Sequence, residues 1–249
     1  MVRGAAGNGN IFMRSNTEDP AQELQELTAH LVDWLRFQRR LGWPGTPAEP
    51  EPEAAAQPPE AGGVLTLKEI RTELGDCKRC KLSRGRQQIV FGDGSARARL
   101  LFIGEGPGEE EDLQGLPFVG AAGQLLNRML NNLGLRREEV YIANVVKCRP
   151  PGNRNPEADE IGQCLPFLLK QIEAIQPRVI VTLGKVSTQV LLGTQAPITQ
   201  IRGRWQKYGK IKVMPTFHPS YLLRFPKERH KTWDDMQQVM EYLAAHEEI

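Results

Sequence analysis

The chain has 249 residues, of which 40% are hydrophobic and 25% are charged, and its formal net charge is +2. This composition is ordinary for a soluble globular protein, and the length suits one large domain with an appendage or two small domains. No apolar run approaches the roughly 20 residues of a membrane helix and residues 1–20 lack the apolar core of a secretory signal, so we expect a cytoplasmic protein without membrane contact.

Charge is unevenly spread along the chain. Residues 1–63 hold five basic and nine acidic residues, which leaves 27 basic and 21 acidic residues for positions 64–249. The larger part is therefore basic, and a basic surface favours a polyanionic partner such as nucleic acid. Charge alone fits a solvated basic surface equally well.

The first quarter of the chain differs in composition from the rest. Residues 20–42 predict an amphipathic helix, because leucines recur there at three- and four-residue spacing. Residues 43–63 are rich in proline, alanine and glutamate, which is typical of a semi-extended linker. We therefore expect an extension over residues 1–42, a linker over 43–63 and a globular domain over 64–249. The helix either docks loosely on the domain or binds a protein partner.

Helix and strand patterns alternate from residue 64 onwards. The apolar patterns predict strands within residues 98–106, 138–150, 177–184 and 210–220. They predict helices within residues 66–74, 120–134, 157–175, 185–193 and 232–246, with Pro166 kinking or dividing the third of these. This alternation predicts an α/β protein, a three-layer α/β/α sandwich with a central, mostly parallel sheet.

Three unusual loops leave predicted strands, and ligands of such sheets bind beyond the carboxyl ends of strands. One is the acidic glycine loop "GEGPGEEED" at 104–112, one is "NVVKCRPPGNRNP" at 144–156, and one is "TFHPSYLL" at 216–223. Glycine loops often cradle phosphate with the help of a lysine, but no lysine or arginine lies between Arg99 and Arg128. The sequence thus argues against a phosphate-binding enzyme, while the loop's backbone amides can still donate to a neutral ligand.

The four cysteines of the chain form one spaced set. Cys77 and Cys80 make a C-x2-C pair, and Cys148 and Cys164 are separated by fifteen residues. Four thiolates suit tetrahedral zinc or a cubane iron–sulfur cluster, and the spacing does not decide between them. Four unrelated buried thiols are the alternative. A redox dithiol at the first pair would leave the other two cysteines unexplained.

Phe118, Asn144 and His218 follow or end these strand patterns. Singly, they could be a core residue, a turn former and a loop histidine. Together they suit a flat heterocycle, because an aromatic face stacks on it, an amide offers a donor and an acceptor to one edge, and an imidazole bonds an oxygen on another edge.

With these segments in view, the chain resembles the family 4 uracil-DNA glycosylases, the iron–sulfur class of bacteria and archaea. The segments that carry the resemblance are "CKRCKL", "GEGPGEEED", "PFVGAAGQLL", "NVVKCRPPGNRNP" and "TFHPSYLL", in the family's order over residues 66–245. The resemblance implies a repair enzyme that hydrolyses the N-glycosidic bond of uracil in DNA and leaves an abasic site. It also implies a structural [4Fe-4S] cluster on the four cysteines. The first sixty or so residues have no part in it.

The resemblance also assigns residues to the uracil pocket. Phe118 would stack on the base, Asn144 would read its Watson–Crick edge and His218 would contact its O2. The loop residues Glu105, Gly106 and Pro107 would line the pocket.

In the classical uracil-DNA glycosylases an aspartate that orients water stands where this chain has Gly106, a departure typical of family 4. Glu105 and Glu111 are therefore the candidates for positioning water, and Glu111 could instead block the 5-methyl group of thymine. The other acidic residues of the loop should face the sugar or the pocket wall.

DNA is the expected partner, bound by a monomer with the uracil flipped out. Residues 221–223 could wedge into the gap left in the base stack, and five arginines are candidate phosphate contacts, Arg149, Arg154, Arg202, Arg204 and Arg224. The alternative is a non-catalytic metal-containing module that binds nucleic acid, which would need neither Asn144 nor His218.

Overall fold

The structure is a computed structural model that describes residue 28 and residues 64–246. The helix predicted over 20–42 and the linker predicted over 43–63 lie outside the described residues, apart from Thr28, which is helical.

Six strands form one sheet in the order β1-β3-β2-β4-β6-β5. The four central strands are parallel, and the short edge strands β1 and β5 are antiparallel to their neighbours. Their bounds are β1 (Asp93–Gly94), β2 (Leu100–Gly104), β3 (Tyr141–Asn144), β4 (Val179–Leu183), β5 (Gln206–Tyr208) and β6 (Ile211–Thr216). The predicted α/β class with a mostly parallel sheet is confirmed, while the two edge strands were not predicted.

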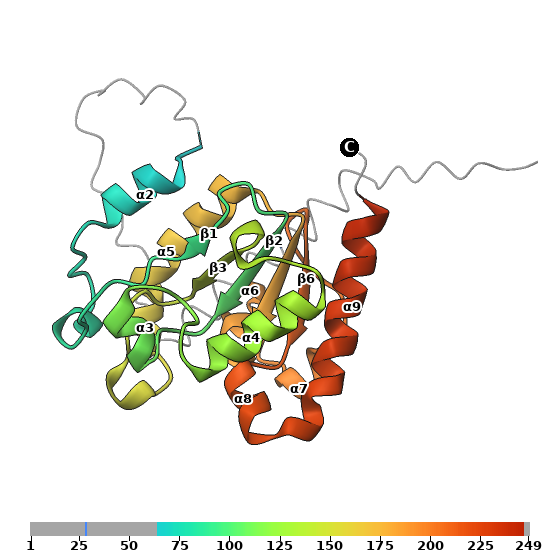
Figure 1. Ribbon diagram of the computed structural model, residues 1–249. Coiled ribbons are helices and arrows are strands. Elements are labelled where there is room, and N and C mark those ends of the chain that lie inside the picture. Colours follow the sequence, from blue (N-terminus) through green and yellow to red (C-terminus); the bar gives the residue numbers. More distant parts are fainter. Residues whose placement is uncertain (1–27, 29–63, 247–249) are drawn as a thin grey trace, which may run out of the picture. The chain divides into compact units, whose positions relative to one another are not determined.

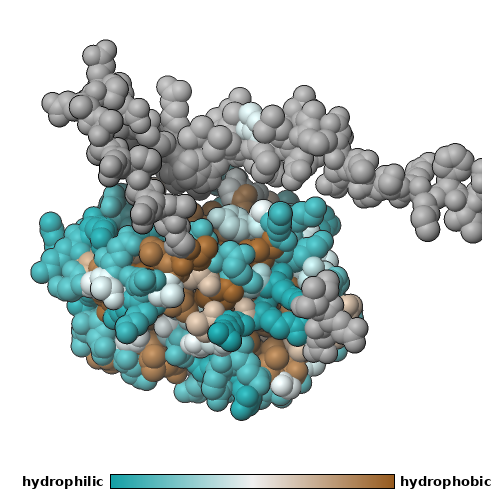
Figure 2. Space-filling view, turned by 90° about the horizontal axis from the view of Figure 1, so that it is seen from above, coloured by the Kyte–Doolittle hydropathy of each residue, from teal (hydrophilic) through white to brown (hydrophobic). Residues whose placement is uncertain are grey.

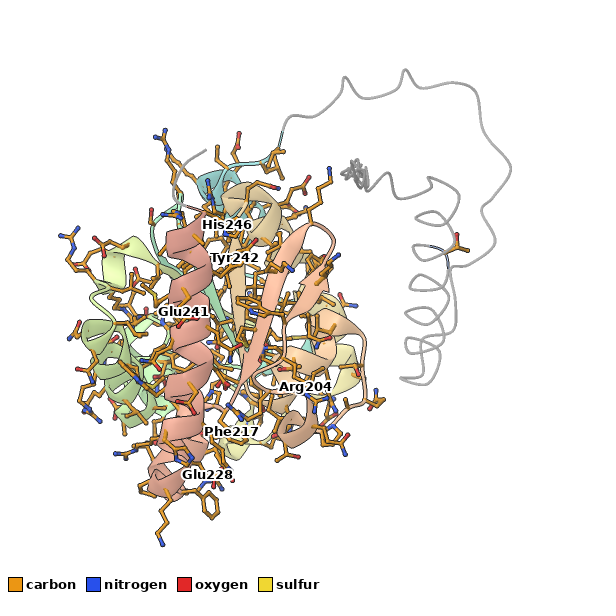
Figure 3. The ribbon with its side chains drawn as sticks, turned by 90° about the vertical axis from the view of Figure 1, so that its right-hand side faces the viewer. Arg204, Phe217, Glu228, Glu241, Tyr242 and His246 are labelled. Atoms are coloured by element: carbon orange, nitrogen blue, oxygen red, sulfur yellow. The ribbon has the colours of Figure 1, made fainter. Side chains whose placement is uncertain are left out.

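Side chains of successive strand residues point to opposite faces of the sheet, and helices cover both faces (Figure 1). Leu101 and Ile103 of β2 pack with helices α5 and α6, whereas Leu100 and Phe102 pack with helices α4 and α9. The bounds of these helices are α4 (Ala121–Asn132), α5 (Ala158–Ile175), α6 (Lys185–Leu192) and α9 (Arg229–Ala245). Figure 3 shows α9 crossing its face of the sheet, with Glu228 near one end and the stacked rings of Tyr242 and His246 near the other.

Two local predictions about helices have different outcomes. Thr66 caps α2 (Leu67–Leu74): its hydroxyl accepts from the Glu69 backbone N–H, and Glu69 accepts in return from the Thr66 N–H. Pro166, however, does not divide α5, which runs as one helix from Ala158 to Ile175. Of the two expected effects of this proline, a kink or a division of the helix, the division does not occur, because the buried residues on either side of the exposed proline belong to one continuous apolar face.

The loops that follow β2, β3 and β6 meet at the carboxyl edge of the sheet, the lower end in Figure 1. They contain α3 (Glu109–Gln114), the 3-10 turn η3 (Pro151–Asn153) and α8 (Pro219–Arg224). The last four residues of the loop predicted over 104–112 are the start of α3, and all four are acidic. Negative charge in a first helical turn favours the helix.

Short elements complete the described chain. They are η1 (Lys81–Arg84), η2 (Arg137–Glu139), α7 (Ile198–Ile201) and η4 (Pro226–Glu228). In the described part of the chain, no helix has the length and apolar character needed to cross a membrane. Figure 2 views the end of the molecule opposite the carboxyl edge, where hydrophilic side chains surround a more hydrophobic centre.

Candidate active site

A cavity of about 570 Å³ opens at the carboxyl edge of the sheet, which is within the usual range for a small-molecule site. It is lined by residues from the loops after β2, β3, β4 and β6. Every residue that the sequence analysis assigned to the pocket lines it: Glu105, Gly106, Pro107, Glu111, Phe118, Asn144 and His218. The structure thus brings together residues that are up to 113 positions apart.

Asn144 ends β3 and is buried, with 1% of its surface exposed. Its side-chain oxygen has no hydrogen-bond partner among the described residues. A side chain at Gly104, on the neighbouring strand β2, would collide with this oxygen and with the Phe118 ring. Glycine at position 104 therefore allows the amide and the ring to meet at one wall of the cavity. A buried unpaired acceptor is costly, so this amide is suited to a ligand that donates to it.

Phe118 is held in an unusual backbone conformation. Its φ is 53°, in the left-handed region that a bulky residue rarely adopts. Arg137 donates to the carbonyl of Phe118 at 3.2 Å and also to that of Pro117, which fixes the loop in this conformation. Phe118 is 5% exposed, and the centroid of its ring lies 5.5 Å from that of His218. Strain of this kind is typical of functional sites.

His218 is the N-cap of α8, and its side chain is oriented by that helix. Nδ1 accepts from the backbone N–H of Ser220 at 3.1 Å. Since Nδ1 accepts, the proton of the neutral ring is placed on Nε2. Burial lowers the pKa of His218 to about 4, with Glu111 opposing and Arg224 reinforcing this effect. His218, which lines the cavity, therefore carries a neutral Nε2–H donor at pH 7.

Glu105 follows β2 directly and lies partly buried at the cavity wall. Among the described residues its carboxylate has no hydrogen-bond partner, and burial raises its pKa to about 7. A carboxylate held in this state changes charge near neutral pH, which suits a group that acts on developing charge or on water.

Glu111 also lines the cavity but is engaged by the backbone. Its carboxylate accepts from the N–H groups of Gly108 at 3.1 Å, Val119 at 2.8 Å and Gly120 at 2.9 Å. It thereby ties α3 to the loop that carries Phe118. This geometry favours Glu105 over Glu111 for contact with the reacting atoms.

The other acidic residues of α3 do not line the cavity, so the expectation that they face it is wrong. Asp112 is buried and accepts from the backbone N–H groups of Gln87 and Gln88. Glu109 pairs with Arg149 at 3.5 Å. These acids stabilise the loop structure around the site.

Several candidate DNA contacts are used elsewhere in the fold. Leu222 is completely buried in a cluster with Leu125 and Phe217, so it cannot wedge between bases. Arg202 pairs with the buried Asp235, and Arg154 makes a bidentate pair with the buried Glu160. These ion pairs tie Arg202 to α9 and Arg154 to α5, and Arg154 also lines the cavity.

Other polar residues of the cavity were not singled out from the sequence. They are Asn153, Asn155, Lys185 and Ser220. Lys185 and Arg224 are exposed cations at the rim. The signal for Lys185 was its place two residues after the end of β4, at the same sheet edge as the other loops.

The four cysteines meet at a second, smaller cavity. Cys77, Cys80, Cys148 and Cys164 all line it, together with Leu74 and Ile89. Three of the sulfurs accept N–H donors: Cys77 from Arg79 at 3.3 Å, Cys148 from Arg86 at 3.5 Å and Cys164 from the Lys147 backbone at 3.2 Å. Within the described residues, no three metal-binding side chains converge closely enough for a single ion.

Burial sets the chemistry of these thiols. It raises the pKa of Cys80 and Cys164 and raises that of Cys148 to about 11, while Arg86 beside Cys148 acts in the opposite direction. The N–H···S bonds favour the thiolate form, which is the form that binds metal.

Comparison with known proteins gives consistent matches. The model of the family described as the uracil DNA glycosylase superfamily matches residues 91–244. A type-4 uracil-DNA glycosylase of Saccharolobus solfataricus is 47% identical over 185 residues, which are 71% of this chain and 86% of that protein. Those of Thermotoga maritima and Archaeoglobus fulgidus are 52% and 41% identical, over 64% and 71% of this chain and 84% and 92% of theirs. The family model includes every residue that lines the larger cavity.

Proposed function

The chain belongs to the uracil-DNA glycosylase superfamily and, within it, to the type-4 enzymes, and we infer from this membership that it is itself a uracil-DNA glycosylase. It is a hydrolase that cleaves the N-glycosidic bond between uracil and deoxyribose. The products are free uracil and an abasic site, as the first step of base excision repair. The larger cavity is the proposed uracil pocket.

The observation that carries the pocket assignment is the unpaired side-chain oxygen of Asn144. Its buried oxygen matches the N3–H donor of uracil, and its NH₂ group can donate to O4. Cytosine presents an acceptor at N3 and a donor at N4, so the same amide opposes it. Phe118 beside it supplies the face on which the flipped base stacks.

We expect Asn144→Ala to weaken both binding and cleavage, by about tenfold or more, because it removes a buried hydrogen-bonding partner of the base. Asn144→Asp should relax discrimination toward cytosine, because the carboxylate can accept from N4. The measurements are single-turnover cleavage and the affinity for DNA that contains a non-cleavable uracil nucleotide. Asn132→Asp, at an exposed position of α4, is the matched control. A folded Asn144→Ala variant with parental binding and rate would refute the assignment.

His218 is proposed to stabilise the departing base. Breaking the bond between C1′ and N1 leaves negative charge on uracil and positive charge on the sugar. A neutral N–H donor at O2 gains strength as that charge develops, so it lowers the barrier more than it tightens substrate binding. The Nδ1 bond to Ser220 supports this role because it keeps the proton on Nε2.

Glu105 is proposed to act on the sugar side of the reaction. Its carboxylate is free of hydrogen bonds within the described chain, so its charge is available to stabilise an oxocarbenium-like sugar and to orient water. Lys185 and Arg224 at the rim are the proposed phosphate contacts, since both are exposed at the cavity mouth.

The four cysteines are proposed to hold a [4Fe-4S] cluster. A single zinc ion needs its sulfurs about 2.3 Å from one point, whereas a cubane is bound through separate irons and accepts a wider arrangement. The shared cavity and the N–H···S bonds support the cluster, because such bonds tune iron–sulfur sites. When bound, it would serve as a structural cross-link between the segment that carries Cys77 and Cys80, the loop after β3, and α5.

The purified protein is therefore expected to be brown and to absorb broadly at about 400 nm. Cys80→Ser and Cys148→Ser should lower iron content and soluble yield together, because each removes one attachment of the cross-link. Iron and zinc analysis after anaerobic purification checks this. A colourless protein with one stoichiometric zinc would contradict the cluster.

Deleting residues 1–62 is expected to leave cleavage of short oligonucleotides within about twofold of the parental rate, because, among the described residues, none that lines the cavity comes from this segment. Every residue of the cavity lies between positions 105 and 224. A truncated protein that folds but loses most of its activity would show that the extension contributes to the site.

A further inference from the structure

Lys147 is a buried ammonium group that the reaction scheme does not use. It stands three residues after Asn144, and only 1% of its surface is exposed. Burying an ammonium group is costly unless its N–H groups are hydrogen-bonded. Within the described residues its hydrogen-bond partners are two neutral oxygens, the backbone carbonyl of Asn144 at 2.9 Å and Oε1 of Gln171 at 2.6 Å. Its Nζ also lies 6.0 Å from the centroid of the Phe91 ring.

These contacts fix the peptide that follows Asn144. The carbonyl of Asn144 accepts from Lys147 Nζ, and the N–H of Val145 in the same peptide donates to the carbonyl of Gly104 at 3.0 Å. Both polar ends of the peptide are therefore held, while the Asn144 side chain has an unpaired oxygen. The direction of that side chain depends on the backbone at Cα, which this peptide sets.

Gln171 of α5 holds Lys147 in a defined orientation. It is completely buried. Its amide nitrogen donates to the carbonyl of Phe91 at 3.0 Å and to the Tyr141 hydroxyl at 3.2 Å. Since the nitrogen is used on that side, the oxygen faces Lys147. The buried chain of hydrogen bonds thus runs from α5 through Lys147 to the end of β3.

We propose that Lys147 is a positioning residue for Asn144, which holds the end of β3 so that the amide meets the Watson–Crick edge of uracil. Lys147 acts on recognition through Asn144 and does not touch the substrate. This inference rests on the proposed base-reading role of Asn144.

A contribution to the cysteine cavity is the competing explanation, because the backbone N–H of Lys147 donates to Cys164. Lys147→Met separates the two. It keeps the backbone N–H and a side chain of similar length but removes the ammonium group. Lys170→Met is the matched control, since Lys170 is next to Gln171 in the sequence of α5 but is partly exposed and pairs with Glu73 at 2.6 Å instead of joining this network.

The experiment is a double-mutant cycle of Lys147→Met with Asn144→Ala. It measures single-turnover cleavage and binding to DNA with a non-cleavable uracil nucleotide, at matched iron content. We expect Lys147→Met to reduce both by about tenfold, the scale of coupling between residues in one buried network. In the Asn144→Ala background it should change neither by more than about twofold. Lys170→Met should match the parent.

The outcomes are distinguishable. If Asn144→Ala alone has no effect, the proposed function of Asn144 fails. Suppose that Asn144→Ala lowers cleavage and binding as expected. If Lys147→Met then lowers them by the same factor in the Asn144→Ala background as in the parent, the positioning inference is overturned. If Lys147→Met does not give soluble protein, Gln171→Leu replaces it in the same cycle, because it removes the acceptor that orients Lys147 but leaves the ammonium group. If Gln171→Leu lowers cleavage and binding by the same factor with and without Asn144→Ala, the inference is overturned as well.

Discussion

Replacing His218 by alanine is expected to slow single-turnover release of uracil by roughly a hundredfold or more, the usual scale for loss of one donor to a developing anion. The reason is that the Nε2–H of the neutral ring acts mainly on charge that forms in the transition state. Burial keeps the pKa of the ring at about 4, so the donor is neutral throughout the working range of pH. Binding to non-cleavable uracil-containing DNA should change much less.

His230→Ala is the matched control, because His230 is exposed and its Nδ1 contacts the Lys227 carbonyl outside the cavity. Thermal unfolding of both variants shows whether α8 survives the loss of its cap. A well-folded His218→Ala protein that releases uracil at the parental rate would mean that the donor lies elsewhere.

Glu105→Gln is expected to lower the rate by about a hundredfold, as is typical for loss of a positioned acid or base, and to abolish one limb of the pH profile. The pKa of Glu105 is raised by burial to about 7. If the charged form acts on the sugar, the parental rate should rise as pH increases through about 7 and level off above it. Glutamine cannot ionise, so its profile should be flat in this range.

The stability of the folded protein provides a second check on Glu105. The charged carboxylate is expected to favour the reaction but to disfavour the folded state. A carboxylate whose pKa in the folded state lies above its unfolded value destabilises the charged fold, so this cost is complete above pH 7 and disappears below the unfolded value. Glu105→Gln should therefore unfold at the same or a higher temperature than the parent at pH 8. Glu110→Gln, exposed on α3, is the control. A parental rate in Glu105→Gln, or an unaltered pH limb, would exclude Glu105.

The location of the site could be predicted from the sequence, because three loops with unusual residues each follow a predicted strand. Parallel strands bring such loops to one edge, so Asn144 and His218 could be placed together without a structure. The hydrogen-bonding state of these side chains could not be predicted in this way. The unpaired oxygen of Asn144 and the tautomer of His218 depend on neighbours from other segments.

Tertiary contacts explain what the sequence could not indicate. Glu111 was a candidate for positioning water, and nothing in the sequence indicated that three backbone amides bind its carboxylate. Leu222 was expected to wedge between bases, but it fills a core cluster. Lys147 stands in "NVVK", where a lysine usually reaches solvent, and nothing local indicates its burial. The helix α3 had a local signal, since acidic residues after a glycine suit a first helical turn.

Product analysis on DNA that contains one uracil is the most direct test of the glycosylase activity. The protein in excess is incubated with this oligonucleotide and with matched ones that carry cytosine or thymine, and free base and alkali-labile sites are quantified. The account predicts equal amounts of free uracil and abasic sites, no release from the cytosine or thymine strand, and strongly slowed release by His218→Ala. A folded protein that binds the DNA but releases no uracil would contradict it.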